Sequence, residues 1–159
     1  MSDEIKKGLV GVISDETKVS EVMPEINSLT YRGYAVQDLC KNSSFEEVSY
    51  LLLSGELPNK DQLDLFKRKE RSNRTISNSL KETIKNYPKG AHPMDTTRTS
   101  VSHMGLEDPQ TADNSHEANM AKAIRLLAKI STAVAADFRT RKGQDIIEPD
   151  ESLGFSENF

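Results

Sequence analysis

The sequence predicts an all-α protein that carries one small β-ribbon close to its amino terminus. Apolar residues recur at three- and four-residue spacing through most of the chain after residue 34, which is the repeat of an amphipathic helix. Short β-branched runs, which are typical of strands, are confined to residues 9–34. We therefore divide the chain into an amino-terminal β-ribbon or arm over residues 1–34 and a helical portion over residues 35–159.

The ribbon is expected to start with a hairpin. Residues 9–13 (LVGVI) and 19–23 (VSEVM) form its two strands, residues 14–18 form the polar turn between them, and Pro24 closes it. Residues 28–31 (SLTY) are expected to add a third strand. A ribbon of this size is not stable alone, so it has to pack against other elements.

Capping residues and glycines predict where the helices begin and end. Ser44 followed by glutamates in the first turn is a capping pattern, and Gly55 is expected to end that helix. Asn59 is a cap for the next helix. Alanines along the last long helix would let another helix approach closely. The expected helices span residues 36–41, 44–55, 59–71, 77–87, 93–105 and 118–141, with the start of another at 152–159.

The hydrophobic core is thin for a chain of this length. Hydrophobic residues make up 35% of the 159 residues, and the eight Gly add about 5%, against roughly 45–50% in typical globular domains counted the same way. The net charge of −4 is small, so a folded chain is favoured over a disordered one. This composition favours either a loosely built domain or a part of a larger core.

Composition also argues against several classes of protein. No apolar run approaches the roughly 18–20 residues that cross a bilayer, and the charged start MSDEIKKG is unlike a signal peptide. A single cysteine excludes an internal disulfide framework and a zinc site built from cysteines. The acidic balance, the absence of Trp and the 6% of aromatic residues disfavour nucleic-acid binding. We expect a cytoplasmic protein with no membrane or nucleic-acid partner.

No set of residues predicts a catalytic, cofactor-binding or metal site. His92, His103 and His116 are far apart and belong to no metal-ligand motif, so we interpret them as helix-start or surface residues. Cys40 lies on the apolar side of a short predicted helix and is expected to be a packed thiol rather than a nucleophile.

Two charged groups allow a functional as well as a structural interpretation. The basic run of residues 67–74 (KRKERSNR) is either a solvated helix face or an anion site for a carboxylate or phosphate. Arg32, Asp95 and Arg98 are interpreted as an internal ion-pair network.

Three motifs in this order resemble the amino-terminal part of citrate synthases: YRGY at 31–34, LLLSGELP at 51–58 and HPMDTTRT at 92–99. The likeness runs from about residue 7 to residue 159 and is greatest to the bacterial citrate and 2-methylcitrate synthase group. It implies that the helical portion is an incomplete part of a multi-helical large domain. It also implies a homodimer whose substrates are oxaloacetate and acetyl-CoA or propionyl-CoA, with no other cofactor.

Members of the citrate synthase family are longer than this chain and use two histidines and an aspartate. The histidines stand in PLHGG-like and GFGH-like segments, neither of which occurs in these 159 residues. The resemblance therefore implies an amino-terminal fragment that lacks the catalytic residues and is inactive alone. Lys69 in the basic run is the one residue expected to bind substrate, because some members place a cation there near the partner's site.

Two other functions compete with this interpretation. The first is a non-catalytic helical dimerisation or interaction protein derived from a citrate synthase. The second is a nucleic-acid binder that uses residues 67–74, which the acidic net charge disfavours.

Overall fold

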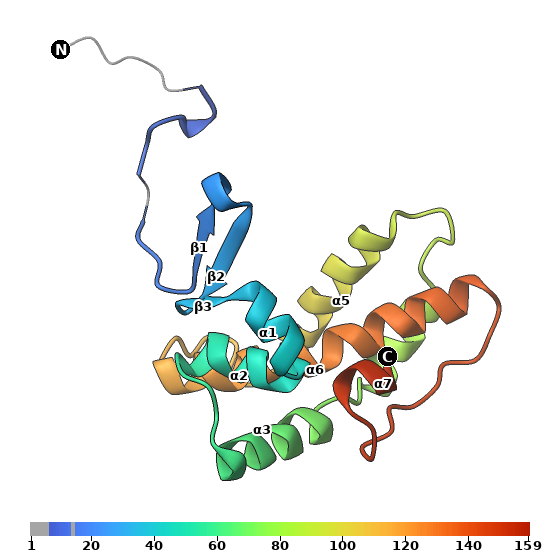
Figure 1. The fold of residues 1–159 in the computed structure, drawn as a ribbon. Helices are drawn as coiled ribbons and strands as arrows, with labels where there is room; N and C mark the ends of the chain where they lie inside the picture. The colour runs from blue at the N-terminus through green and yellow to red at the C-terminus, as the bar shows by residue number, and fades with distance from the viewer. Residues whose placement is uncertain (1–6, 14) are drawn as a thin grey trace.

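The computed structural model describes residues 7–13 and 15–159 and confirms the predicted fold class. A body of α-helices carries one small antiparallel sheet, and residues 7–13 project from the sheet end of the molecule (Figure 1). The division of the chain into two units at residues 34 and 35 stays a prediction. The helices are α1 (Val36–Asn42), α2 (Phe45–Ser54), α3 (Lys60–Ser72), α4 (Asn78–Lys85), α5 (Pro93–Glu107), α6 (His116–Arg141) and α7 (Phe155–Asn158).

The sheet is a three-stranded meander in the order β1-β2-β3. Asn27 adopts a left-handed conformation, with φ of +49°, where the chain turns from the first strand into the second. Arg32 and Gly33, with φ of +50° and +87°, make the tighter turn into the third. The strands are β1 (Ser20–Met23), β2 (Ser28–Tyr31) and β3 (Tyr34–Ala35), and the 3-10 turn η2 (Pro24–Ile26) joins the first two.

The predicted hairpin between residues 9–13 and 19–23 is wrong. The described part of the amino-terminal segment begins with a 3-10 turn, η1 (Lys7–Leu9), and residues 10–13 form no strand. Leu9 and Gly11 have φ values of +60° and +74°, which extended strands do not adopt. The partner of β1 is instead β2, with Val22 opposite Leu29. Residue 14, in the predicted turn, lies outside the described residues.

The predicted helix caps are confirmed. The Ser44 hydroxyl accepts a hydrogen bond from the Glu47 backbone N–H at 3.3 Å, and the Glu47 carboxylate accepts one from the Ser44 N–H at 2.7 Å. Asn59 and Gln62 form the same reciprocal pair at the start of α3. Gly55, with φ of +94°, follows the last residue of α2 in a left-handed conformation that favours glycine.

The core lies where α4, α5 and α6 meet. Leu80 and Ile84 of α4 are almost completely buried there, together with Met104 of α5. Small residues complete the contact, because Ala133 and Ala136 of α6 are buried as well. Two of the alanines expected at a helix contact are thus buried where α6 meets α4 and α5, whereas Phe138 on another side of α6 stays 60% exposed.

Cys40 is exposed, so its predicted role as a packed thiol is wrong. Its neighbour Leu39 is only 4% exposed and takes the inward position on α1. A helix of seven residues offers few inward positions, and the larger leucine side chain fills this one.

Candidate functional site

The basic run of residues 67–74 divides into outward and inward side chains. Arg68 and Lys69 of α3 are exposed, whereas Arg74, just after the helix, is 1% exposed. Its guanidinium makes a two-point ion pair with Glu70, from Nε to Oε1 at 2.8 Å and from Nη2 to Oε2 at 2.7 Å. Since Glu70 is 0% exposed, the pair is sealed from solvent.

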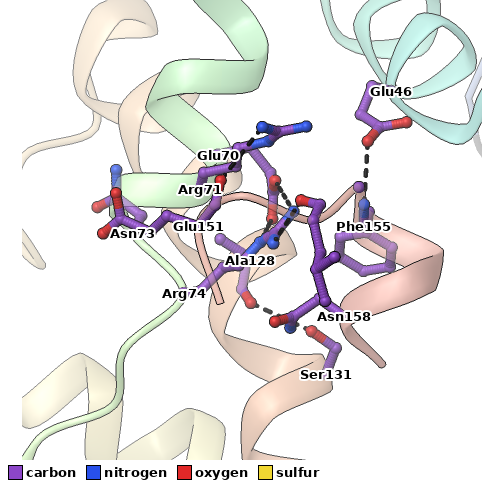
Figure 2. Close-up of polar contacts among 12 residues, drawn as sticks. Glu46, Glu70, Arg71, Asn73, Arg74, Ala128, Ser131, Glu151, Phe155 and Asn158 are labelled. Carbon is purple, nitrogen blue, oxygen red and sulfur yellow. Dashed lines mark hydrogen bonds and ion pairs between the residues drawn. The ribbon is translucent and has the colours of Figure 1, made fainter. Parts of the chain in front are cut away.

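The inward arginines bind the backbone of the carboxyl-terminal segment. The remaining nitrogen of Arg74, Nη1, donates to the carbonyl oxygens of Asp150 and Leu153, each at 3.0 Å. Arg71 Nη1 donates to the Glu151 carbonyl at 3.1 Å and to that of Ser152 at 3.4 Å. Figure 2 shows both arginines directed at this segment. This half of the run therefore binds the protein's own carbonyls rather than an external anion.

The outward half of the run borders a groove of about 480 Å³ between α3 and α6. Within the described part of the chain the Lys69 ammonium makes no hydrogen bond or ion pair, so its charge is available to a ligand. The other strong cation of the groove, Arg125, is engaged, because its Nη2 lies 2.6 Å from Asp108 Oδ2. The groove is lined by Lys69, Asn73, His116, Glu117, Met120, Ala121, Ile124 and Arg125.

Asp108 is held in its charged form by the contacts around it. The Gln110 backbone N–H donates to its carboxylate at 2.9 Å, and Arg125 donates from two nitrogens. These hydrogen bonds keep the pKa of Asp108 below its usual range. Of the Lys and Arg side chains that line the groove, Lys69 is therefore the one without an ion-pair partner among the described residues.

The predicted internal network of Arg32, Asp95 and Arg98 is wrong. Arg98 and Asp95 do pair at 3.0 Å, but their side chains are 78% and 58% exposed on the outer face of α5. Arg32 belongs to the turn between β2 and β3 and donates to the Leu52 carbonyl at 3.0 Å instead. A three-residue spacing on a helix brings two charges together without deciding which face is buried.

A buried polar network does exist around Asp137 of α6, and it includes Thr96, the neighbour of Asp95 on α5. Its carboxylate accepts from the Thr96 hydroxyl at 2.9 Å and from Arg141 Nε at 2.8 Å. Arg141 Nη1 in turn donates to the carbonyls of Lys89 and Ala91. The network therefore ties α5 and α6 to the loop that precedes the HPMD motif.

The histidines lie at helix starts and in a contact between helices. His92 caps α5, with Nδ1 accepting from the Met94 N–H at 3.2 Å, and His116 is the exposed first residue of α6. His103 Nε2 lies 3.2 Å from Ser79 Oγ and 3.3 Å from Glu107 Oε1.

The Ser79, His103 and Glu107 side chains do not form a hydrolytic triad. A triad needs the hydroxyl and the carboxylate on opposite ring nitrogens, so that the base is oriented from behind. Here both groups share Nε2 of His103. The three side chains therefore join α4 to α5 and do not activate a nucleophile.

Among the described residues, no group of three or more His, Cys, Asp or Glu side chains is placed to hold a metal ion. None of the described helices is both long and apolar enough to cross a membrane.

The buried charges of Glu70, Arg74 and Asp137 were not predicted from the sequence. The four-residue spacing of Glu70 and Arg74, typical of a helical ion pair, was the one signal for them.

One protein family matches nearly the whole chain. The family model described as "Citrate synthase, C-terminal domain" matches residues 8–159. The citrate synthase of Mycolicibacterium smegmatis is 49% identical over 155 residues, which cover 98% of this chain and 41% of that protein. The 2-methylcitrate synthase 2 of Corynebacterium glutamicum is 52% identical over 158 residues, again 98% of this chain and 41% of that protein.

The fold of the chain also matches that of a solved citrate synthase. The crystal structure of citrate synthase from Pyrobaculum aerophilum superposes with a TM-score of 0.89 at 31% sequence identity. The match covers 97% of this chain and 40% of the solved one. The chain thus spans about two fifths of the length of the curated relatives and of the solved structure that it matches.

Proposed function

The chain belongs to the citrate synthase family, and from this premise we propose that it forms the amino-terminal part of an acyltransferase. The proposed reaction joins an acyl-CoA, oxaloacetate and water to give citrate or 2-methylcitrate and CoA. The observation that carries the proposal is the match of the family model to residues 8–159, together with relatives named for both products.

The 159 residues alone are proposed to be inactive. The reaction needs a base for the α-proton of the acyl-CoA, a donor to the enol oxygen and a donor to the ketone under attack. These groups have to be held together over one pair of bound substrates. The histidine-bearing segments expected for this role do not occur in residues 1–159. We place those groups in a further part of the protein.

A thiol-release assay tests the proposed inactivity. The purified chain is incubated with oxaloacetate and either acetyl-CoA or propionyl-CoA, and free CoA is followed with a thiol reagent. We expect the rate of the no-enzyme control. Turnover above that rate would overturn the claim that the catalytic groups lie elsewhere.

A chimera tests whether the chain serves an active enzyme. Residues 7–159 replace the corresponding stretch of the M. smegmatis citrate synthase, which is 49% identical to this chain over 155 residues. We expect the chimera to condense acetyl-CoA or propionyl-CoA with oxaloacetate. A chimera that folds and dimerises like its parent but shows no turnover would contradict the proposed function.

Lys69 is proposed to bind an anionic group of a substrate. Its support is an exposed ammonium at the edge of the groove between α3 and α6, with no hydrogen bond or ion pair to any residue that the structure describes. In the active chimera, Lys69→Met should raise the KM for one substrate several-fold and leave kcat unchanged. The effect is small because a charge-assisted contact at an exposed site contributes only modestly to the free energy of binding. Arg68→Met on the same exposed turn is the matched control. Equal KM values for the two variants would show that Lys69 does not bind substrate.

The proposed enzyme is a cytoplasmic homodimer. Its support is the family itself, in which we expect the long helices to pack across a dimer interface. Sedimentation of the chimera at several concentrations tests the dimer, and fractionation of cells with a tagged chain tests the location. A monomer at all concentrations, or a tag recovered with membranes, would contradict these two points.

The second candidate function is a non-catalytic dimerisation or interaction protein. It is favoured by α6, which buries Ala133 and Ala136 in the core and leaves Phe138 60% exposed. A chain that acts in this way should be monodisperse and unfold cooperatively by itself. A chain that only serves the enzyme should aggregate or bind a hydrophobic dye through that exposed face.

A further inference from the structure

A cavity to which the proposed reaction assigns no role lies where the end of α5, the loop after it and the middle of α6 meet. Its volume is about 460 Å³, which falls in the range of roughly 300–1,000 Å³ that is common for small-molecule sites. Residues 101–111 line one side of the cavity and residues 122–129 line the other. We call it the α5–α6 cavity.

The floor of the α5–α6 cavity is apolar. Met104, which is 7% exposed, belongs to the buried core, and Leu126 packs against that core. Both side chains line the cavity, together with Val101 and Pro109. Gly105 keeps the space open, because a Cβ at this position would meet no atom within 4 Å. The shape and the lining therefore suit the apolar body of a small ligand.

Hydrogen bonds hold the rim of the cavity in place. The Lys122 ammonium donates to the carbonyl oxygens of Thr111 and Asp113, and the Thr111 hydroxyl donates to that of Asp108 at 2.7 Å. Arg125 binds the Asp108 carboxylate through two nitrogens. The loop is thus fixed to both helices, and a ligand would find the cavity already formed, which lowers the entropic cost of binding.

The charge that remains free at the cavity is positive. Both acids of the lining are engaged, since Glu107 accepts a hydrogen bond from the Ser77 hydroxyl at 2.6 Å and Asp108 is paired with Arg125. Lys122 is used by the loop carbonyls. Lys129 is half-buried and makes no hydrogen bond or ion pair to any residue that the structure describes. A half-buried ammonium without a partner is unfavourable, and an anion in the cavity would relieve this cost.

We propose that the α5–α6 cavity binds an aliphatic carboxylate. Its hydrocarbon chain lies against Met104 and Leu126, and its carboxylate accepts a charge-assisted hydrogen bond from Lys129. A neutral ligand of the same shape would leave the ammonium unpaired. A ligand with a second negative charge would bring that charge close to Glu107 and Asp108. This site does not depend on the proposed synthase activity.

A titration with octanoate, followed by NMR of methyl-labelled methionines in the whole 159-residue chain, tests the site. Met104 reports on the α5–α6 cavity, Met120 reports on the groove beside Lys69, and Met94, which is 65% exposed, borders neither. We expect octanoate to shift the Met104 signal saturably and to leave those of Met94 and Met120 in place. Octanol lacks the charge and acetate lacks the chain, so each should bind at least about tenfold more weakly.

Two variants separate the roles of charge and space. Lys129→Met keeps the apolar stem and removes the charge, so octanoate should bind about tenfold more weakly while octanol binds as before. Gly105→Leu fills the cavity and should abolish the binding of both. It should fold, because its Cβ has free space and leucine favours a helix more than glycine does. Lys41→Met, an exposed lysine of α1, is the matched control and should change neither affinity.

Several outcomes would overturn the proposal. One is a Met104 signal that octanoate does not move, and another is equal octanoate affinity in Lys129→Met and the unsubstituted chain. A shift confined to Met120 would place the ligand beside Lys69 instead. The same titration in the folded chimera should again shift Met104. A chimera whose Met104 signal stays in place would show that another part of the enzyme fills the cavity, whether or not the chimera has turnover.

Discussion

Arg74 and Glu70 lie one helical turn apart, at the end of α3, and form a two-point ion pair that water does not reach. Their side chains are 1% and 0% exposed. Burying two charges is favourable only when each keeps its full set of partners. Here the carboxylate accepts two bonds from the guanidinium, and the third arginine nitrogen donates to the carbonyls of residues 150 and 153. The pair therefore links the stability of α3 to the position of residues 150–153.

Removing one member of this pair should be strongly destabilising. Glu70→Leu leaves the Arg74 guanidinium buried and uncompensated, and we expect a loss of about 3–5 kcal/mol in the free energy of unfolding. The double variant Glu70→Leu/Arg74→Met removes both charges and should recover part of that loss. Urea unfolding followed by circular dichroism measures both. A double variant no more stable than the single one would contradict this account.

The cap of α2 should contribute a measurable share of stability. Ser44→Ala removes the hydroxyl that accepts the Glu47 N–H, and we expect a loss of about 1 kcal/mol. Ser43→Ala is the matched control, because the neighbouring hydroxyl makes no hydrogen bond within the described residues. Equal unfolding midpoints for the two variants would show that the cap contributes nothing.

The same cap should make stability depend on acid pH. Hydrogen bonds from the Ser44 N–H and hydroxyl hold the pKa of Glu47 below its ordinary value of 4.5, and Lys67 adds a smaller effect of the same sign. A lowered folded-state pKa means that the ionised form favours folding. This stability is present above about pH 4.5 and is lost as the pH falls through the folded-state pKa.

The measurement compares the unsubstituted chain with Glu47→Gln between roughly pH 6 and pH 3. We expect the difference in unfolding free energy between them to shrink as the pH falls through the folded-state pKa of Glu47. A difference that stays constant over this range would show that Glu47 does not titrate as described.

Close packing of α6 should make its buried alanines intolerant of larger side chains. Ala133 is 2% exposed in the core, and Ala133→Leu should destabilise the fold by about 1–3 kcal/mol through overpacking. Ala135→Leu is the control, since Ala135 borders a cavity of about 470 Å³, lined on its other side by Pro149 and Phe159, and has room for the added atoms. Thermal unfolding of both variants tests the difference, and an equal loss in the two would contradict it.

Features set by neighbouring residues were predictable from the sequence. Ser44, Asn59 and Gly55 act within one turn of their own position, and each takes the predicted role. The order of the three motifs was enough for the family, which the family model confirms over residues 8–159. In the candidate site, Lys69 is exposed, and its contact with substrate stays a prediction.

Features that need distant partners were not predictable. The β-branched run of residues 9–13 has the composition of a strand, yet β1 pairs with β2 because the left-handed residues Leu9 and Gly11 interrupt that run. Asp95 and Arg98 have the spacing of an ion pair, yet the pair lies on the exposed side of α5. Spacing determines which side chains of one helix meet, and packing determines whether solvent reaches them.

By itself, then, the sequence determined the helical class, the bounds of most helices and membership of the family, because these depend on periodicity, caps and motif order. The tertiary structure alone decided that Arg74 faces inward while Lys69 faces a groove, although the two lie only five positions apart in one basic run. The reason is physical. The carbonyls that accept hydrogen bonds from Arg74 belong to Asp150 and Leu153, which lie 76 and 79 positions further along the chain. A buried charge is stable only beside such partners, and only the folded chain brings them together.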